Sequence, residues 1–163
     1  MDSGKIKITN LVATSGKEYG INELLPNGKQ YMDRDYTFNY IPDELKGCTH
    51  ILTCGNDKLT DEKDLCLSFT VDAPVEVNIL FADKFPTIPI WLNDFERVRL
   101  NVTRSDSDPS NLRGYFSIYR KRYPKGEIQL FGCSPSYFLK KDWFVESLGF
   151  TYCMYTIALK RIE

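Results

Sequence analysis

The chain has 163 residues, of which 42% are hydrophobic and 13% aromatic, enough apolar material for a folded core, so a disordered chain is excluded. Its 21 Lys and Arg residues balance 22 Asp and Glu residues, for a formal net charge of -1. Without a basic excess, nucleic acid is not an expected partner. Apolar runs fall far short of the ~20 residues that span a bilayer, so no membrane insertion is expected.

The N-terminal segment, MDSGKIKITN, lacks the apolar run of a secretory signal peptide. A cytosolic protein and a secreted protein whose leader has been removed both fit this segment, and the sequence does not separate them. No internal repeat and no linker rich in Pro or Ser divides the chain. We therefore interpret residues 1–163 as a single domain.

Alternation of apolar and polar residues recurs along the chain between Gly, Pro, Asn and Asp residues, which is the pattern of strands separated by turns. The predicted strands comprise, in chain order, KIKITNLVA, QYMDRDYTFNYI, THILTCG, LCLSFTV, VEVNILF, RGYFSIYRKRYP, GEIQLFG and FTYCMYTIALKRI. Roughly eight or nine strands at such spacings are typical of an all-β sandwich or barrel. The predicted fold is an antiparallel β-sandwich.

Helical patterns are few and short. INELL and PDELKG each predict about one helical turn, and SYFLKKDWFVESLG predicts a short helix with Asp142 as its N-cap and Gly149 at its end. The segment TRSDSDPSNLRG, residues 103–114, is the most loop-like part of the chain. The fold class is thus all-β with one or two short helices.

Four segments carry a family pattern in a consistent order: YMDRDYTFNYIPDELKGCTHILTCGNDK (31–58), LSFTVDAPVEVNILFAD (67–83), PIWLNDF (89–95) and YRKRYPKGEIQLFG (119–132). Together they resemble the galactose-binding-like jelly-roll modules, similar to carbohydrate-binding accessory domains of secreted bacterial polysaccharide-degrading proteins. The stretch Ala82-Asp83-Lys84-Phe85, the cysteines and the C-terminal segment depart from this pattern. The resemblance implies a jelly roll that binds a ligand without catalysis and that often carries a structural calcium ion.

The stretch FADKFPTIPIWLNDF, residues 81–95, brings an acid, a base and a large aromatic close together in sequence. In a carbohydrate site the Trp91 ring would cover the apolar face of a sugar, Asp83 would accept hydrogen bonds from its hydroxyls, and Lys84 would donate. The alternative is that Trp91 packs into one end of the sandwich, while Asp83 and Lys84 cap a turn.

Two arginines complete the predicted ligand-binding set. Arg120 belongs to the basic segment YRKRYPKG, which fits either the binding of an anionic polysaccharide or an ordinary polar hairpin. Arg34 lies in a predicted strand between Asp33 and Asp35, where it belongs either to a binding surface or to ion pairs on a solvated face.

The loop CGNDKLTDEKD, residues 54–64, concentrates carboxylates between two strands. Calcium prefers several such oxygens on a flexible loop, and Asp57 and Asp61 are the candidate ligands. The spacing is not that of an EF-hand, and a solvated turn is the alternative reading.

The five cysteines form no CxxC pair, and several lie within strand patterns, so we interpret them as free and buried rather than as a disulfide framework. No catalytic residue is predicted, because His50 is the only histidine and neither a GxSxG motif nor a phosphate loop is present. A carboxylate pair for glycoside cleavage is the remaining catalytic alternative. The sequon Asn101-Val102-Thr103 is a glycan acceptor if the protein is secreted.

The favoured function is therefore a non-catalytic ligand-binding module, with carbohydrate as the expected partner. A protein-interaction or structural module that presents an edge strand or a loop is the alternative. A glycoside hydrolase is the third hypothesis.

Overall fold

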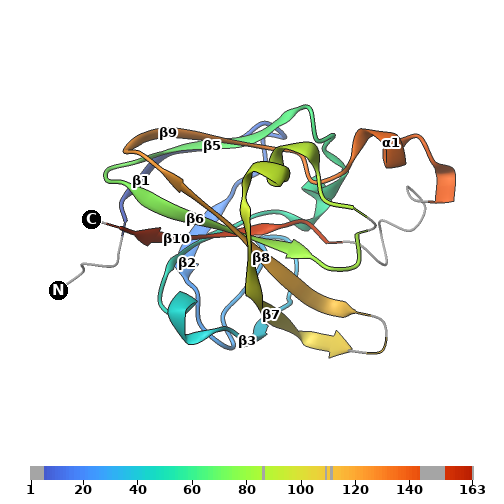
Figure 1. The fold of residues 1–163 in the computed structure, drawn as a ribbon, viewed down its shortest axis with the longest axis horizontal. Coiled ribbons are helices and arrows are strands. Elements are labelled where there is room, and N and C mark those ends of the chain that lie inside the picture. Colours follow the sequence, from blue (N-terminus) through green and yellow to red (C-terminus); the bar gives the residue numbers. More distant parts are fainter. Residues whose placement is uncertain (1–5, 86, 109, 111, 144–152, 163) are drawn as a thin grey trace.

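Two antiparallel sheets pack face to face as a β-sandwich, which confirms the predicted all-β class (Figure 1). The computed structural model describes residues 6–85, 87–108, 110, 112–143 and 153–162. None of the helices among these residues is long and apolar enough to cross a membrane. The helical elements that lie wholly within the described residues are short: η1 (Asp43–Leu45), η2 (Gly55–Leu59), η3 (Ile90–Asp94) and α1 (Ser136–Leu139).

The smaller sheet has the strand order β1-β5-β9 and covers one side of the molecule (Figure 1). Its strands are β1 (Ile8–Ala13), β5 (Leu65–Val71) and β9 (Gly126–Phe131). Phe69 pairs with Ile128 and Leu67 with Leu130, and all four side chains are buried. Alternation therefore places one face of this sheet on the core, as the period-two pattern predicted.

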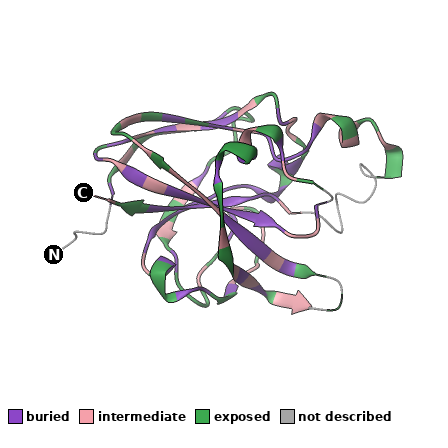
Figure 2. Cartoon of the chain, in the orientation of Figure 1, coloured by how far each residue is buried: buried purple, intermediate pink, exposed green. Residues whose placement is uncertain are grey.

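The larger sheet has the strand order β2-β4-β10-β6-β8-β7-β3. Its central strands, β6 and β10, are mostly buried (Figure 2). The sheet consists of β2 (Gly20–Glu23), β3 (Phe38–Tyr40), β4 (Thr49–Leu52), β6 (Val75–Ala82), β7 (Glu96–Asp108), β8 (Arg113–Tyr123) and β10 (Thr156–Arg161).

The larger sheet is strongly curled. Phe38 lies on β3 at one end of the strand order and His50 on β4 near the other end, yet their ring centroids are only 5.2 Å apart. Because the two ends approach each other, the concave face encloses apolar side chains of its own, including the fully buried Leu80 and Ile118. Both faces of β6 are therefore buried, which explains why its second half, residues 79–82, is continuously apolar.

Several predicted elements differ from the structure. INELL forms the strand β2 and not a helical turn, because residues 20–23 pair along their whole length with β4. The loop predicted for residues 103–114 is shorter, since β7 continues to Asp108 and β8 begins at Arg113. Within SYFLKKDWFVESLG, α1 begins earlier than predicted, at Ser136, but Asp142 and Trp143 are helical too, and the predicted end at Gly149 lies outside the described residues. The single turn predicted in PDELKG is confirmed as η1.

All five cysteines are free thiols, and four of them are buried, as predicted. Burial is the main cause that raises the pKa of the Cys66 thiol to about 11. A thiol with so high a pKa stays protonated near neutral pH and behaves as a small apolar side chain.

Burial of the only histidine makes the stability of the protein depend on pH. His50 is fully buried, and its Nδ1 atom lies 2.8 Å from Oδ1 of Asn22. Burial lowers the pKa of His50 from 6.5 to about 3. Below pH 6.5 the histidine of the unfolded chain therefore binds a proton, whereas His50 of the folded protein stays neutral. We expect this residue to lower the free energy of unfolding by about 1.4 kcal/mol per pH unit between pH 6 and pH 4.

Urea denaturation of the wild type and of His50→Gln at pH 7.5, 5.5 and 4.5 checks this expectation. The substitution removes the titrating ring, so the difference between the two free energies of unfolding should change by roughly 3 kcal/mol between pH 7.5 and pH 4.5. Parallel pH profiles for the two proteins would contradict the assignment, since carboxylates titrate in both.

Candidate functional site

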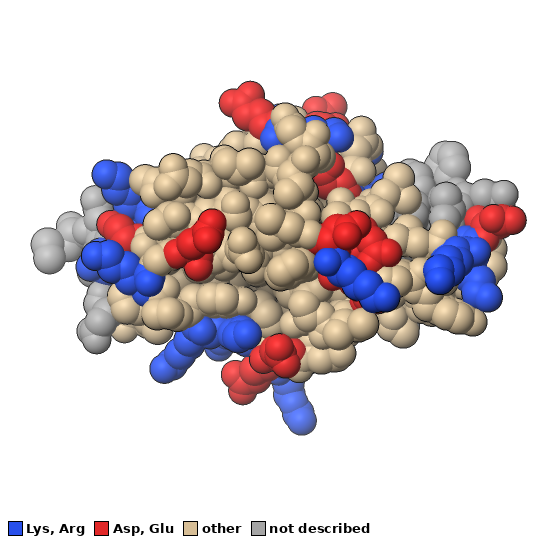
Figure 3. Space-filling model, turned by 90° about the horizontal axis from the view of Figure 1, so that it is seen from above, with Lys and Arg blue, Asp and Glu red and all other residues tan. Residues whose placement is uncertain are grey.

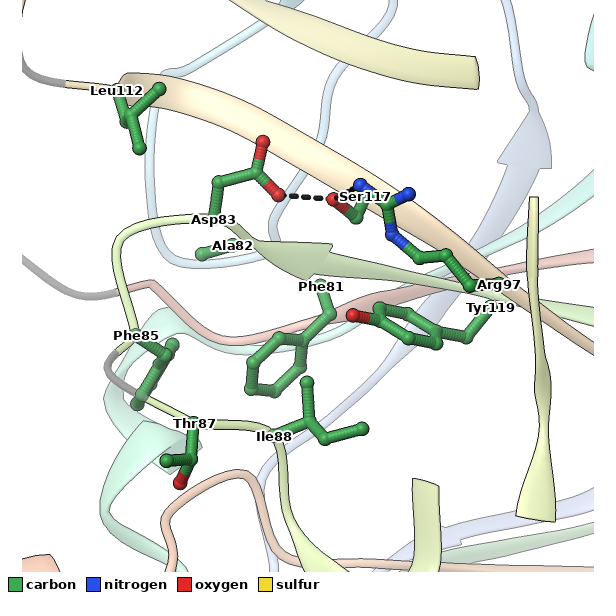
Figure 4. A pocket seen from close by; sticks show the side chains of 10 residues that line it. All are labelled: Phe81, Ala82, Asp83, Phe85, Thr87, Ile88, Arg97, Leu112, Ser117 and Tyr119. Atoms are coloured by element: carbon green, nitrogen blue, oxygen red, sulfur yellow. Dashed lines mark hydrogen bonds between the residues drawn. The ribbon is translucent and has the colours of Figure 1, made fainter. Parts of the chain in front are cut away.

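A pocket of about 370 Å³ lies where β6 ends beside β7 and β8. In Figure 4 its polar side chains Asp83, Ser117 and Arg97 lie along one side, and the rings of Phe81 and Tyr119 lie beneath them. A volume of this size is in the range of small-molecule sites. This pocket is the candidate functional site.

Strand register brings the polar side chains together. Ser117 pairs with Phe81 of β6, and Tyr119 pairs with Arg97 of β7, so these side chains share one face of the sheet. Between Val98 and Asn101 the register of β7 shifts by a bulge, so that Asn101 pairs with Ser117. Bulges re-aim side chains, and here the bulge adds the amide of Asn101 to the polar group.

A chain of hydrogen bonds fixes the polar side of the pocket. The hydroxyl of Ser117, which is buried, donates to Oδ1 of Asp83, and Nη2 of Arg97 donates to Oγ of Ser117 over 2.7 Å. Nδ2 of Asn101 donates to Oδ2 of Asp83 over 3.2 Å. The acid and the base are thus held in place by a shared hydroxyl before any ligand arrives.

Apolar side chains form the rest of the pocket. The Phe81 ring packs against Phe85, with 4.9 Å between centroids, and edge-on against Tyr119 at 6.5 Å. Ile88 lies on the side away from the polar residues (Figure 4). The guanidinium of Arg97 lies 5.7 Å from the centre of the Tyr119 ring. The pocket therefore combines an apolar floor with fixed polar groups along one edge.

The three residues of the predicted 81–95 site do not share one location. Asp83 lines the pocket, and Lys84 follows it in the half-buried turn without lining the pocket. Trp91 lies in η3, where its Nε1 donates to the carbonyl of Gly132 over 2.9 Å. Its ring meets Phe95 and Tyr155 edge-on, with centroid distances of 5.7 and 5.5 Å. These contacts fit the alternative stated above, in which Trp91 packs into one end of the sandwich.

Arg120 lies on the opposite face of the sheet from the pocket. Its Nε donates to Oδ1 of Asn78 over 3.0 Å, and its Nη2 donates to Oε1 of Glu44 over 3.0 Å. Nε also lies 3.2 Å from the carboxylate of Glu76. Arg120 lines a separate, smaller hollow of about 250 Å³ formed by charged side chains. The structure does not bring it together with Asp83.

Arg34 lies outside any strand, contrary to the prediction. The segment turns away because the carboxylate of Asp33 accepts hydrogen bonds from the amides of Gly55 and Asn56 at the start of η2. Arg34 in turn donates to Oδ1 of Asn56 over 2.6 Å and pairs with Asp33 over 3.1 Å. These contacts join residues 33–34 to η2 and do not reach the pocket residues.

The two candidate calcium ligands already have protein partners. Asp57 is buried and accepts hydrogen bonds from Tyr19 over 2.5 Å and from Ser15 over 2.9 Å. Partial burial acts to raise the pKa of Asp61, but hydrogen bonds from Ser136 and from the Lys63 amide outweigh it and hold that pKa below its ordinary value. Within the described part of the chain, no group of three or more His, Cys, Asp or Glu side chains is arranged to hold a metal ion.

Sequence reasoning missed Arg97, Ser117 and Asn101. Alternation did place Ser117 and Tyr119 on one face of a strand, which was a usable signal for half of the pocket. Asn101 was read only as a glycan acceptor, although its amide also donates to Asp83 and to the carbonyl of Phe116. A glycan at this position would require that amide to leave both partners.

Charged side chains are dispersed over the face of the molecule that Figure 3 shows. On the face shown in Figure 3, Lys and Arg side chains alternate with Asp and Glu side chains, and most of the surface is uncharged. This distribution agrees with the balanced composition, and that face therefore has no electrostatic potential of a single sign.

No family model matches the chain, and no curated protein is similar to it. Solved structures do match. A β-glucuronidase from glycoside hydrolase family 2 aligns with a TM-score of 0.67 and 19% identity, over 94% of this chain and 14% of that chain. A GH138 enzyme targeting pectin rhamnogalacturonan II aligns with a TM-score of 0.57 and 12% identity, over 100% of this chain and 17% of that chain.

The chain shares its fold with a part of each enzyme. At these identities the likeness concerns the fold alone. The chain spans about one seventh of the length of the first enzyme and about one sixth of the second.

Proposed function

We propose that the chain is a non-catalytic carbohydrate-binding module of the galactose-binding-like type, and that the pocket around Asp83, Ser117 and Arg97 is its ligand site. The observation that carries this proposal is the pre-oriented acid and base on one side of a pocket with an aromatic floor. Sugars present both hydroxyls and an apolar C–H face, and this lining offers partners for each.

The shared fold gives independent support. Both solved relatives named above are carbohydrate-active enzymes, and each contains this β-sandwich as a small part of a longer chain. The likeness supports a carbohydrate-associated β domain. The activities and substrates of those enzymes are not assigned to this chain.

The lining of the pocket favours binding over cleavage. Glycoside hydrolysis ordinarily requires two carboxyl groups on either side of the scissile bond. Asp83 is the only carboxylate among the described residues that line the pocket. Its two oxygens already accept hydrogen bonds from Ser117 and Asn101. These features suit a fixed hydrogen-bonding group.

A glycan array followed by isothermal titration calorimetry tests the proposal. Asp83→Asn is expected to weaken the binding of a glycan identified on the array by about tenfold or more, since hydrogen bonds to a charged group contribute about 1.5–3 kcal/mol. Arg122→Ala is the control, because Arg122 is exposed and pairs in register with Glu76, on the opposite face of the sheet.

Circular dichroism and melting temperature show whether each variant is folded. Tyr119→Phe offers a second, gentler change at the floor of the pocket and keeps the ring. A wild type that binds no glycan overturns the proposal. So does a folded Asp83→Asn that binds as tightly as the wild type.

Protein interaction is the second candidate function, and one observation favours it. Tyr137 of α1 is 64% exposed and Trp143 is 53% exposed, and both rings contact Phe138 edge-on. Exposed aromatic clusters mark interaction surfaces more often than ordinary surface. Self-association measured by light scattering, and lost on Trp143→Ser, would support this function.

A further inference from the structure

We infer that the pocket selects sugars that carry a carboxylate, such as uronic acids, and that Arg97 determines this preference. The inference rests on the proposed carbohydrate-binding function and deepens it by naming the ligand class. It follows from which polar groups in the pocket are already satisfied by the protein and which are not.

Both carboxylate oxygens of Asp83 already have a protein donor, and each keeps one further acceptor site for a ligand. Oδ1 of Asp83 accepts from Ser117, and Oδ2 accepts from Asn101. The backbone amide of Asp83 is also engaged, donating to the carbonyl of Tyr115 over 2.9 Å. Protein donors therefore already compensate the negative charge at both oxygens.

The base of the pocket, Arg97, keeps most of its hydrogen-bond donors unused by the protein. Nη2 of Arg97 donates to Ser117, and Nη1 makes only a long contact of 3.4 Å with the carbonyl of Val98. Across the described residues, no carboxylate lies within ion-pair distance of Arg97. A guanidinium has five N–H donors in a rigid fork, so most of them remain for a ligand.

Two less exposed arginines of this sheet contrast with Arg97. Arg104 of β7 is bonded through two nitrogens to Asp106, and Arg120 of β8 pairs with Glu44 and Glu76. Arg97 is exposed, and its contacts with Ser117 and the Tyr119 ring hold it at the pocket without neutralising it. An oriented guanidinium without an acidic partner suits a planar carboxylate, which it can bind through two parallel hydrogen bonds.

Two hydroxyl groups of the pocket also favour a ligand that carries a carboxylate. The hydroxyls of Tyr119 and Thr87 form no hydrogen bond to any other described residue. Both can donate, as Arg97 does, so the groups left for a ligand are mostly donors. The apolar floor of Phe81 and Phe85 then favours an anion carried by a ring over a small hydrated ion.

Calorimetric titration with matched sugar pairs tests the inference. The probes are methyl β-D-glucuronide against methyl β-D-glucoside, and methyl α-D-galacturonide against methyl α-D-galactoside, which differ only in a carboxylate in place of a hydroxymethyl group. Sodium acetate and sodium sulfate serve as anions without a sugar ring. We expect the acidic member of at least one pair to bind about tenfold tighter than its neutral partner at low salt.

Arg97→Gln is expected to bring the two members of that pair to similar, weak affinities, while Arg97→Lys retains only part of the preference because it lacks the fork. Arg122→Ala removes one charge from the opposite face and should leave the preference unchanged. The preference should also weaken at 0.5 M sodium chloride, since salt screens an exposed charge pair.

The outcomes separate this inference from the function on which it rests. Equal affinities for acidic and neutral sugars, both reduced by Asp83→Asn, would overturn the inference and leave a neutral-sugar module. Acetate or sulfate binding as tightly as the uronides would overturn it in favour of a general anion site. A wild type that binds none of the sugars, on the array or in solution, would overturn both.

Discussion

Gly132→Ala is expected to reduce the free energy of unfolding by about 4 kcal/mol or more, enough to prevent stable folding. A Cβ atom at this position would lie 1.9 Å from the carbonyl oxygen of Asp61 and 2.3 Å from that of Thr60. Both are backbone atoms, and the amide of Gly132 donates to the carbonyl of Asp64 over 3.0 Å, so neither segment can move apart freely. Soluble yield and urea denaturation measure the loss.

Gly55→Ala is the matched control for this change. There an added Cβ would meet only the flexible side chain of Arg34, at 3.3 Å, and we expect a loss of less than about 1 kcal/mol. If the two variants were equally stable, the close approach of Gly132 to residues 60 and 61 would not be a feature of the folded protein.

Trp91→Ala is expected to destabilise the protein by about 3 kcal/mol and to leave glycan binding by the folded fraction intact. The ring packs edge-on against Phe95 and Tyr155, and its Nε1 hydrogen bond ends on the carbonyl of Gly132. Its removal therefore costs packing and one hydrogen bond, and Trp91 is not among the residues that line the pocket.

Trp91→Phe separates the two contributions, because it keeps an aromatic ring and loses the N–H. We expect a smaller loss, on the order of 1–2 kcal/mol. Urea denaturation gives the stabilities, and calorimetry at a temperature where each variant is folded gives the affinities. A stable Trp91→Ala protein that has lost glycan binding would place the ligand site at the Trp91 loop and remove it from the Asp83 pocket.

Much of the fold was predictable from local patterns. The alternation in VEVNILF and LCLSFTV corresponds to β6 and β5, and the polar punctuation marks most of the turns. INELL was misread because five residues with one capping-like start satisfy a helical template as well as a strand. Only pairing with β4 decides between them, and that partner lies more than twenty residues away in the sequence.

The candidate site was less predictable, for a related reason. Asp83 was identified because acid, base and tryptophan are close in sequence, yet the structure places Trp91 in a packed corner and gives Asp83 other neighbours. Arg97 and Ser117 reach it through strand pairing, and Asn101 reaches it through a bulge in β7. A bulge has no strong signature in a single sequence, because any two residues can form it.

The position of β10 within the larger sheet has a consequence for how the protein is made. This strand, residues 156–161, lies between β4 and β6 and pairs with both. A chain that emerges from the ribosome presents β4 and β6 more than seventy residues before the strand that joins them is synthesised. Until then each of these two strands exposes an unpaired, strongly apolar edge. Holdase chaperones bind such edges, and nascent chains aggregate through them. Folding of this domain on the ribosome is therefore expected to begin late, after residue 161 has left the exit tunnel.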